Sequence, residues 1–281
     1  MLRSLLFVPG DNLSKIAKAT QIPADALIFD WEDSVLPNQK ESARRNTREF
    51  LRQAKDLPLI FVRVNPVGTS AFGEDSLALQ GQVPDCVMLS KSRSQADVRC
   101  LEEVLNHSGC NGRGTICPLI ESPEGLMNAA SIARDCSSVS AMAFGAEDFS
   151  AEMEIRRTEE EIELLFARST LVTACRAAGK QAIDSPCVEL NNPESLQASA
   201  RRSRNLGFTG KLAIHPNQID TLNQAFMPSE VEVEQARQIV SSLTKAISGA
   251  LAVDGRMVDE AVVRRARQIL RAAGQTAKSQ C

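Results

Sequence analysis

Eight short apolar runs recur along the chain, and segments with helical spacing separate them. Each run is an unbroken apolar stretch rather than an alternating one, which is typical of parallel strands covered on both faces. Their number and their alternation with helices favour a (β/α)8 TIM barrel of the α/β class over an open sheet. The runs are Ser4–Val8, Ala26–Asp30, Leu59–Val64, Cys86–Ser90, Ile116–Ile120, Val139–Phe144, Gln181–Asp184 and Lys211–Ile214.

The sequence beyond the eighth run is more than a barrel needs. Glu230–Ile247 and Asp259–Ala272 have helical spacing, and Gly249–Met257 between them is typical of a loop or hairpin. We therefore expect a barrel over residues 1–228 and a C-terminal helical extension over residues 229–281, both within one domain. Inside the barrel, Thr158–Glu161 has the pattern of a capping box, which predicts a long helix from there to Gly179.

Composition argues against several classes of function. The 281 residues carry a formal net charge of -3, and Tyr is absent while Trp31 is the only tryptophan, so nothing indicates a nucleic-acid partner. No apolar stretch is long enough to cross a membrane, and the N-terminal one is too short for a signal peptide. The eight cysteines are scattered without a C-x-x-C pair, which favours reduced thiols and a cytoplasmic protein.

Charged or polar side chains follow almost every apolar run. In a barrel, the carboxyl ends of all strands meet at one mouth, where enzymes of this fold place their sites. Taken singly, each has a simpler explanation, because an Asp after a strand often caps the next helix and an Arg in a strand often pairs with a Glu. Capping alone would not place a charged group after nearly every strand, so the set favours a site. Its members are Asp30, Glu32, Asp33, Arg63, Lys91, Glu121, Glu147, Asp148, Asp184 and His215.

Two of these carboxylates, Glu121 and Asp148, follow consecutive strands and offer oxygen ligands that suit Mg²⁺. Zinc is disfavoured, because His107 and His215 are the only histidines. Arg63 is suited to hold a substrate carboxylate bidentately. Together these groups predict a substrate with a carboxylate beside a carbonyl or hydroxyl, such as a 2-oxo acid. Motifs for nucleotide cofactors and for serine hydrolases are absent from the sequence.

Seven segments, spread over nearly the whole chain, resemble the citrate lyase β-chain family of the metal-dependent aldolase superfamily. One segment alone is weakly specific, but seven in the right order are specific. The resemblance implies the barrel fold and a carbon–carbon lyase. The segments are Arg3–Asn12, Ala24–Val35, Val62–Asn65, Leu119–Leu126, Phe144–Ser150, Gly207–Asp220 and Asp254–Ala266.

The resemblance also implies roles for individual residues. Glu121 and Asp148 would be the Mg²⁺ ligands, and Arg63 and Asp259 the catalytic groups. Arg63 would bind the oxo-acid carboxylate, while Asp259 would act as acid/base. In relatives the extension of a neighbouring subunit delivers this Asp, which implies a homo-oligomer, a trimer or a hexamer. The simpler alternative for Asp259 is an N-cap on the last helix, and the two roles are compatible.

Five further residues complete the site that the resemblance implies. Ile214 and His215 would line the substrate pocket. Phe7, Lys15 and Lys18 lie where relatives hold coenzyme A, and the two lysines would meet its phosphates. The alternative for both lysines is that they are solvated residues on a helix.

The family pattern is not matched everywhere. Trp31 and Ser90 stand where relatives commonly have Leu and Pro. Ile214-His215-Pro216 resembles the stand-alone coenzyme A ester lyases, whereas subunits of citrate lyase complexes resemble Ile-Asn-Pro. We therefore expect a Mg²⁺-dependent lyase that cleaves a β-hydroxyacyl-CoA, of the citramalyl-, malyl- or citryl-CoA type. The products would be acetyl-CoA and a 2-oxo acid such as pyruvate.

Three alternatives remain at this point. The first is a β subunit that cleaves a citryl thioester on an acyl-carrier protein to give oxaloacetate and the acetyl thioester. The second is an aldolase that acts on free hydroxy-oxo acids without a thioester. The third is a non-catalytic scaffold subunit, although the joint presence of Arg63, Glu121, Asp148 and Asp259 argues against it.

Overall fold

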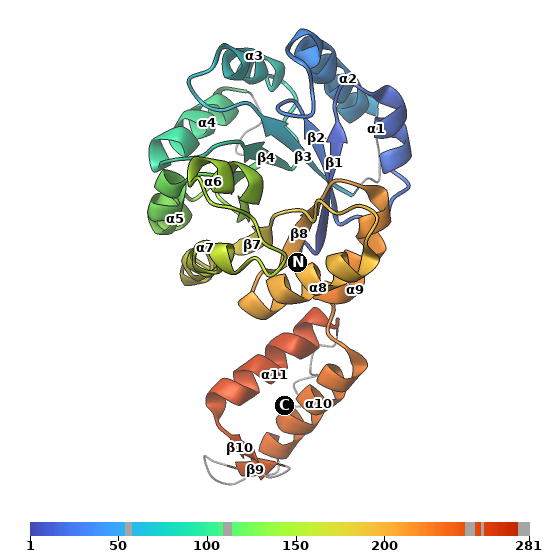
Figure 1. The fold of residues 1–281 in the computed structure, drawn as a ribbon, viewed down its shortest axis with the longest axis vertical. Coiled ribbons are helices and arrows are strands. Elements are labelled where there is room, and N and C mark those ends of the chain that lie inside the picture. Colours follow the sequence, from blue (N-terminus) through green and yellow to red (C-terminus); the bar gives the residue numbers. More distant parts are fainter. Residues whose placement is uncertain (54–57, 109–113, 245–250, 254–255, 275–281) are drawn as a thin grey trace. The chain divides into compact units, whose positions relative to one another are not determined.

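A computed structural model describes residues 1–53, 58–108, 114–244, 251–253 and 256–274. The chain forms two compact units, Leu2–Asn223 and Gln224–Cys281, the second of which also includes Met1. The first unit is the barrel and the second is the C-terminal extension, and each is described by itself (Figure 1). The assignment of both to one domain, and the contact of the extension with a neighbouring subunit, stay predictions.

Eight parallel strands close into a barrel in which each strand pairs with the next and β8 returns to β1. The predicted (β/α)8 fold is therefore confirmed. The register is continuous at the carboxyl ends, where Pro9 lies opposite Asp30 and Asp30 lies opposite Arg63. The strands are β1 (Ser4–Pro9), β2 (Ala26–Asp30), β3 (Leu59–Val64), β4 (Cys86–Leu89), β5 (Thr115–Ile120), β6 (Ala141–Phe144), β7 (Gln181–Asp184) and β8 (Gly210–Ala213).

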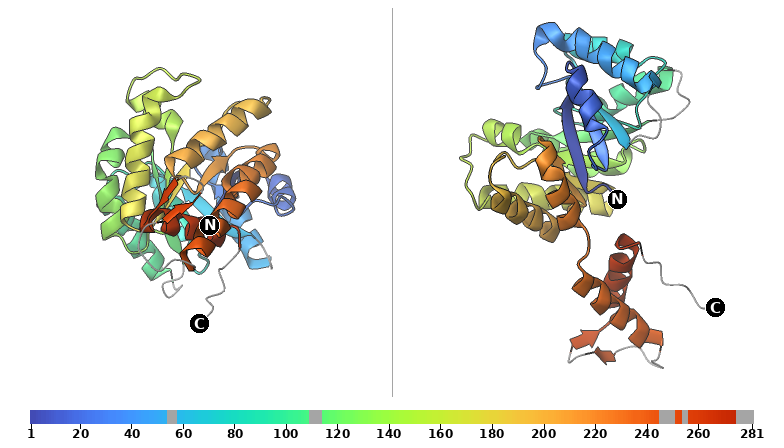
Figure 2. Two further views of the ribbon diagram at one scale, coloured as in Figure 1. Left: turned by 90° about the horizontal axis from the view of Figure 1, so that it is seen from below. Right: turned by 90° about the vertical axis from the view of Figure 1, so that its right-hand side faces the viewer.

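Helices surround the strands as an outer ring (Figures 1 and 2). The α-helices of this ring are α1 (Leu13–Ala19), α2 (Lys40–Gln53), α3 (Ser70–Ala78), α4 (Gln95–His107), α5 (Pro123–Asp135), α6 (Ala146–Glu152), α7 (Leu165–Ala177), α8 (Pro193–Leu206) and α9 (Ile219–Phe226). Three short 3-10 turns accompany them, η1 (Pro37–Gln39), η2 (Ile162–Leu164) and η3 (Pro216–Gln218).

Alternate residues of every strand fill the interior of the barrel, as the two-residue period of a strand requires. The resulting core is wholly apolar, and it contains Leu5, Ile28, Phe61, Met88, Leu119, Ala143, Ile183 and Leu212. Two residues further along each strand, the same inward direction is reached again at the carboxyl end. The residue two positions after each core residue therefore faces the space at the carboxyl end of the barrel and lines any cavity there.

Local signals at helix ends agree with the sequence in most places. The Ser122 side chain accepts a hydrogen bond from the Gly125 amide and Pro123 opens α5, as expected of an N-cap followed by proline. The capping box at Thr158 is a wrong prediction, because α7 begins only at Leu165. Glu161 has a φ of 55°, which no right-handed helix can contain. The Glu161 amide does donate to the Thr158 hydroxyl, but the Thr158 amide and hydroxyl donate to the carboxylate of Glu163.

The second unit contains α10 (Glu230–Thr244), α11 (Glu260–Ala272) and a small antiparallel sheet of β9 (Leu251–Val253) and β10 (Arg256–Val258). The two helices pack through Val233, Ala236, Ala266 and Leu270. The end of the first predicted helix at Ile247 lies outside the described residues, as does part of the predicted hairpin. Within the described ranges, no helix is both long and apolar enough to span a bilayer.

Candidate active site

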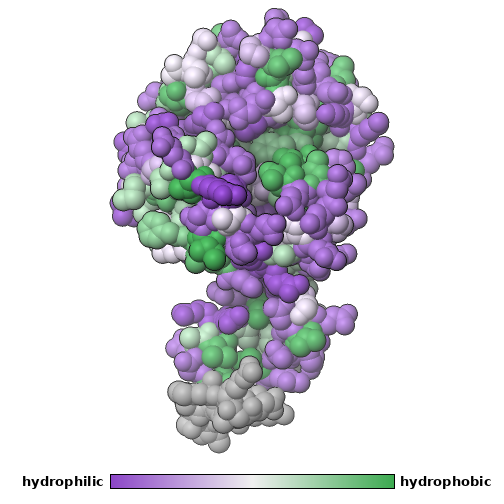
Figure 3. Space-filling view, viewed as in Figure 1, coloured by the Kyte–Doolittle hydropathy of each residue, from purple (hydrophilic) through white to green (hydrophobic). Residues whose placement is uncertain are grey.

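A cavity of about 190 Å³ lies at the carboxyl ends of the strands. Its walls include the inward positions that follow the apolar core: Phe7, Asp30, Arg63, Glu121, Gly145, Ser185 and Ile214. In the space-filling view the barrel face is hollowed near its centre, where apolar side chains are ringed by a mostly hydrophilic surface (Figure 3). Along the strands, the last apolar core residue and the cavity-lining residue that follows it are only two positions apart.

Arg63 is held rigidly at one wall of the cavity. Its Nε and Nη2 donate to the two carboxylate oxygens of Asp30 at 2.7 and 2.5 Å, and its Nη1 lies 3.0 Å from Glu32. Its guanidinium carbon also lies 4.7 Å from the centre of the Phe7 ring, within the range of a cation–π contact. Asp30 is fully buried and also accepts from the amides of Glu32 and Ser34. The pair therefore places one edge of a fixed guanidinium beside the cavity.

Glu121 has a buried carboxylate that forms no ion pair with a Lys, Arg or His side chain of the described residues. Only 4% of the residue is exposed, and Oε2 accepts a hydrogen bond of 2.9 Å from the Lys91 amide. Burial, together with the nearby charges of Asp148 and Glu32, raises the pKa of Glu121 to about 8. Room for this side chain exists because residue 145 is glycine, since a Cβ there would lie 2.4 Å from Glu121 Cγ.

Asp148 and Glu32 bring two more carboxylates to the mouth. The Lys91 ammonium lies between them, 3.6 Å from Asp148 Oδ1 and 3.5 Å from Glu32 Oε1. Burial raises the pKa of Glu32 to about 7, although the charge of Arg63 acts in the opposite direction. Among the residues that the structure describes, the four carboxylates of Asp30, Glu32, Glu121 and Asp148 thus form ion pairs at this mouth with Arg63 and Lys91 alone.

This excess of negative charge fits a divalent cation. Oxygen ligands from one or two carboxylates, with water and substrate in the other positions, are typical of Mg²⁺. Within the described residues, no cluster of three or more His, Cys, Asp or Glu side chains is arranged to hold a metal by itself. The donor set therefore fits an ion bound by a carboxylate pair and completed by a ligand, rather than a closed structural site. The Ser90 hydroxyl is another polar group, and it has no hydrogen-bond partner among the described residues although Ser90 is only 1% exposed.

The predicted site residues do not all reach the cavity. Five of them line it: Phe7, Arg63, Glu121, Asp148 and Ile214. The remaining four are Lys15, Lys18, His215 and Asp259.

Three of the remaining four lie elsewhere in the barrel unit, and Asp259 belongs to the second unit. Lys15 and Lys18 are exposed on α1, and the His215 ring caps η3 by accepting from the Asn217 amide at 3.2 Å. The Asp259 carboxylate, in the second unit, accepts from the Val262 amide at 2.9 Å and caps α11, as the simpler alternative predicts.

Asp184 belongs to a different cluster, although it ends a strand. Its carboxylate is fully buried and bonded by Lys211 Nζ at 3.0 Å, by Arg168 Nε at 3.1 Å and by the Ser203 hydroxyl. Burial acts against ionisation, but the charges of Lys211 and Arg168 lower the pKa of Asp184 to about 2. Asp184 is therefore a structural ion, and its position in the sequence does not distinguish it from Glu121.

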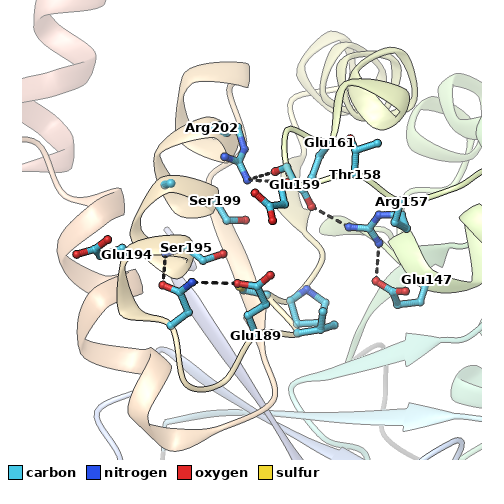
Figure 4. A pocket seen from close by; sticks show the side chains of 15 residues that line it. Glu147, Arg157, Thr158, Glu159, Glu161, Glu189, Glu194, Ser195, Ser199 and Arg202 are labelled. Atoms are coloured by element: carbon cyan, nitrogen blue, oxygen red, sulfur yellow. Dashed lines mark hydrogen bonds and ion pairs between the residues drawn. The ribbon is translucent and has the colours of Figure 1, made fainter.

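A larger cavity of about 630 Å³ adjoins the first, with Glu147 and Pro186 lining both. Arg157 lies between Glu147 and Glu161 at its edge, and Arg202 reaches Glu161 from α8 (Figure 4). The pair of Arg157 with Glu147 links the segment before α7 to α6, and the pair of Arg202 with Glu161 links it to α8. The walls of this cavity come partly from α8 and partly from irregular segments, and no sequence motif marks it.

The sequence pattern includes Lys91 among the charged residues at the strand ends but does not single it out as a functional residue. Lys91 has a φ of 50°, a left-handed conformation that costs a non-glycine residue roughly 1 kcal/mol. Strain of this kind is frequent at functional sites. No sequence pattern predicts it.

A closed (β/α)8 barrel with a carboxylate-rich cavity and a fixed Arg at its carboxyl end defines an enzyme of the metal-dependent aldolase and lyase class. Residues 3–216 match the model of the HpcH/HpaI aldolase/citrate lyase family, and the chain belongs to that family. The resemblance found in the sequence and the expectation of a carbon–carbon lyase are therefore confirmed at the level of the family.

Individual relatives cover nearly the whole chain. The citrate lyase subunit beta of Escherichia coli is 37% identical over 278 residues, which are 95% of this chain and 92% of the relative. The L-malyl-CoA/beta-methylmalyl-CoA lyase of Rhodobacter capsulatus is 32% identical over 299 residues, covering 96% of this chain and 94% of the relative. The crystal structure of CitE from Mycobacterium tuberculosis with magnesium, acetoacetate and coenzyme A has a TM-score of 0.82 at 33% identity, covering 97% and 98% of the two chains.

Proposed function

We propose that this protein is a Mg²⁺-dependent lyase that cleaves a β-hydroxyacyl-CoA into acetyl-CoA and a 2-oxo acid. One observation carries the proposal: the buried carboxylate of Glu121, whose pKa is raised, lines the same cavity as Asp148 and the fixed guanidinium of Arg63. Magnesium and coenzyme A in the related CitE structure support the same reading.

Glu121 and Asp148 would hold the metal. When bound, Mg²⁺ supplies positive charge that stabilises negative charge on the oxygen of the group that becomes the oxo-acid carbonyl. Nη1 of Arg63 would bind the oxo-acid carboxylate in place of Glu32, because Asp30 already occupies the other two nitrogens. Arg63 thus orients the substrate without a reorganisation of its own side chain.

The reaction needs one proton removed and one returned. A base takes the hydroxyl proton, the carbon–carbon bond breaks, and its electron pair passes to the acetyl thioester as an enolate, which is then protonated. Asp259 of a neighbouring subunit is our candidate for this acid/base role, which makes the enzyme a homo-oligomer, a trimer or a hexamer. Its exposed carboxylate, at the N-terminus of α11, is available for such a role.

The cavity is large enough for only one of the two parts of the proposed substrate. About 190 Å³ suits a small oxo acid but not a whole coenzyme A thioester, so the thioester arm must leave through the mouth. Phe7 lines the cavity at the end of β1, and Lys15 and Lys18 are exposed on the helix that follows. They remain our candidates for contacts with coenzyme A, and His215 remains one for the pocket rim.

A second candidate function is cleavage of a citryl thioester carried by an acyl-carrier protein. The 37% identity to the beta subunit of a citrate lyase favours it. The stand-alone enzyme is preferred because Ile214-His215-Pro216 resembles free coenzyme A ester lyases. A cytoplasmic location is part of the proposal, since all six cysteines in the described residues are free thiols.

The test uses the purified full chain with citramalyl-CoA, malyl-CoA and citryl-CoA, each with Mg²⁺ and with a chelator. Release of acetyl-CoA and of the oxo acid is followed. Metal-dependent cleavage of one ester is expected, together with its loss in Asp148→Ala at unchanged circular dichroism. Full activity in Asp148→Ala would refute the metal assignment, and cleavage only of a carrier-bound citryl thioester would establish the second candidate.

A further inference from the structure

One residue, Lys91, touches three of the carboxylates at the mouth. Its amide donates to Glu121 at 2.9 Å, while its ammonium lies 3.5 Å from Glu32 and 3.6 Å from Asp148. The contact through the main chain is a true hydrogen bond, whereas both contacts of the ammonium are longer than hydrogen bonds usually are. The main chain of Lys91 is therefore fixed to the site, and its charge is held loosely.

The fixed half of this arrangement is built by the loop that follows β4. The Ser92 amide donates to the Leu119 carbonyl at 3.1 Å, and the Ser92 hydroxyl donates to the Leu89 carbonyl at 2.9 Å. The loop also lies tightly against the start of α5, where a Cβ at Gly125 would lie only 2.4 Å from the Ser92 carbonyl oxygen. This clamping maintains the left-handed backbone of Lys91 and aims its amide at Glu121.

The loosely held ammonium lies beside Asp148, one of the two proposed metal ligands. The Lys91 side chain is 36% exposed, and an ion pair of that exposure is weak. In the described part of the chain, Lys91 is also the residue that supplies positive charge directly to Asp148. A divalent cation bound by Glu121 and Asp148 would meet a like charge at this position.

We propose that Lys91 is a positioning residue that acts as a built-in counter-ion: its ammonium neutralises Glu32 and Asp148 before the metal binds, and the incoming divalent cation must displace it. The inference rests on the proposed metal site of Glu121 and Asp148. Its consequence is that Lys91 weakens metal binding while keeping the carboxylates together in the metal-free protein. Binding of the metal ion then replaces the Lys91 ammonium with the divalent cation beside Asp148.

The test measures Mg²⁺ affinity of the full-length protein by isothermal titration calorimetry without substrate. Lys91→Met removes the charge but keeps the length of the side chain and the amide that holds Glu121. We expect it to bind Mg²⁺ roughly threefold to tenfold more tightly than the unsubstituted protein, because a like charge close to the ion is gone. Lys91→Arg retains the charge and is expected to restore the original affinity to within about twofold.

Two further variants separate the outcomes. Lys180→Met removes the same charge immediately before β7, at the opposite end of the barrel, and is expected to leave the affinity unchanged. Lys91→Asn also removes the charge, and Asn tolerates the left-handed backbone, so it guards against a folding defect in Lys91→Met. Tighter binding in both neutral variants supports the inference.

Equal or weaker binding in both neutral Lys91 variants, with unchanged circular dichroism, would overturn the counter-ion role but leave the metal site standing. Absence of Mg²⁺ binding in the unsubstituted protein would overturn the metal site and the counter-ion role together. Glu121→Gln identifies the site titrated, because it should abolish the binding in the Lys91→Met background as well.

Discussion

The guanidinium of Arg63 and the carboxylate of Asp30 face each other across neighbouring strands, joined by hydrogen bonds of 2.7 and 2.5 Å. Asp30 is fully buried, so its charge depends on this partner. Because the pair fixes the plane of the guanidinium, it also fixes the direction from which a substrate carboxylate can be bound. The structural role of Arg63 and the substrate-binding role proposed for it therefore belong to one side chain.

Replacement of Arg63 by Lys should separate these roles. A lysine keeps the charge but cannot donate two parallel hydrogen bonds to Asp30, so kcat/KM should fall by on the order of 100-fold or more. The free energy of unfolding should fall by about 1–3 kcal/mol, because part of the buried carboxylate is left without donors. Steady-state kinetics and urea denaturation measure the two effects. Arg52→Lys, on an exposed part of α2, is the control, and near-original activity in Arg63→Lys would contradict the assigned role.

Gly145→Ala should damage the metal site selectively. The added Cβ would lie 2.4 Å from Glu121 Cγ and 2.6 Å from its Oε1, so the glutamate side chain must leave its present position. We expect Mg²⁺ affinity to fall by roughly tenfold or more. Gly73→Ala in α3 is the matched control, since a Cβ there has no heavy atom within 4 Å. An unchanged affinity in Gly145→Ala, measured by calorimetry, would show that Glu121 is not a ligand.

Glu121 should make the metal-free protein less stable as pH rises. Its raised pKa, about 8, means that the folded protein holds a proton that the unfolded chain releases near the ordinary range of glutamate. The associated stability is complete below that ordinary range and is lost as pH rises through about 8. Glu121→Gln mimics the protonated form. In chelator it should exceed the original protein by on the order of 1–3 kcal/mol at about pH 8, and by much less at about pH 5.

Urea denaturation at both pH values measures this difference. Glu103→Gln, at an exposed position of α4, controls for the loss of one charge. A Glu121→Gln variant that is less stable than the original protein at the higher pH would show that the carboxylate is already satisfied without a metal.

Lys211→Met should reduce stability without changing the chemistry. It leaves the buried Asp184 with Arg168 and Ser203 but without the ammonium at 3.0 Å, which should cost about 2–4 kcal/mol. Lys211 does not line the cavity of the candidate site, so kcat of the folded protein should stay within about twofold. A large fall in kcat at unchanged stability would instead mean that this ion network reaches the reaction. Thermal unfolding and kinetics on the same preparation decide between these outcomes.

The sequence predicts the barrel well, because each strand is a continuous apolar run and each strand end carries a turn signal. It also predicts Glu121, Asp148 and Arg63 as members of one cavity, since strand ends converge in a closed barrel. Asp184 shows the limit of this reasoning. It is the last residue of β7, whereas Glu121 comes directly after β5, and its side chain points to Lys211. The direction of a side chain depends on the two-residue period of the strand and not only on its nearness to the strand end.

Features that depend on side-chain geometry or backbone strain were beyond prediction. The pattern at Thr158 resembles a helix start, but Glu161 pairs with Arg168 and Arg157 and adopts a left-handed backbone instead. Tertiary ion pairs here outweigh a local propensity of about 1 kcal/mol. The contacts of Lys91 likewise arise only when β2, β4, β5 and α6 are brought together.

The origin of the cavity in seven strand ends has a consequence for how such an enzyme can diversify. Each wall comes from a separate strand, two residues beyond a core that the other strands also support. A single replacement at Phe7, Ser185 or Ile214 would therefore reshape one wall while the carboxylates keep their places. Substrate range can drift one position at a time, and the barrel does not have to be rebuilt for each new acid.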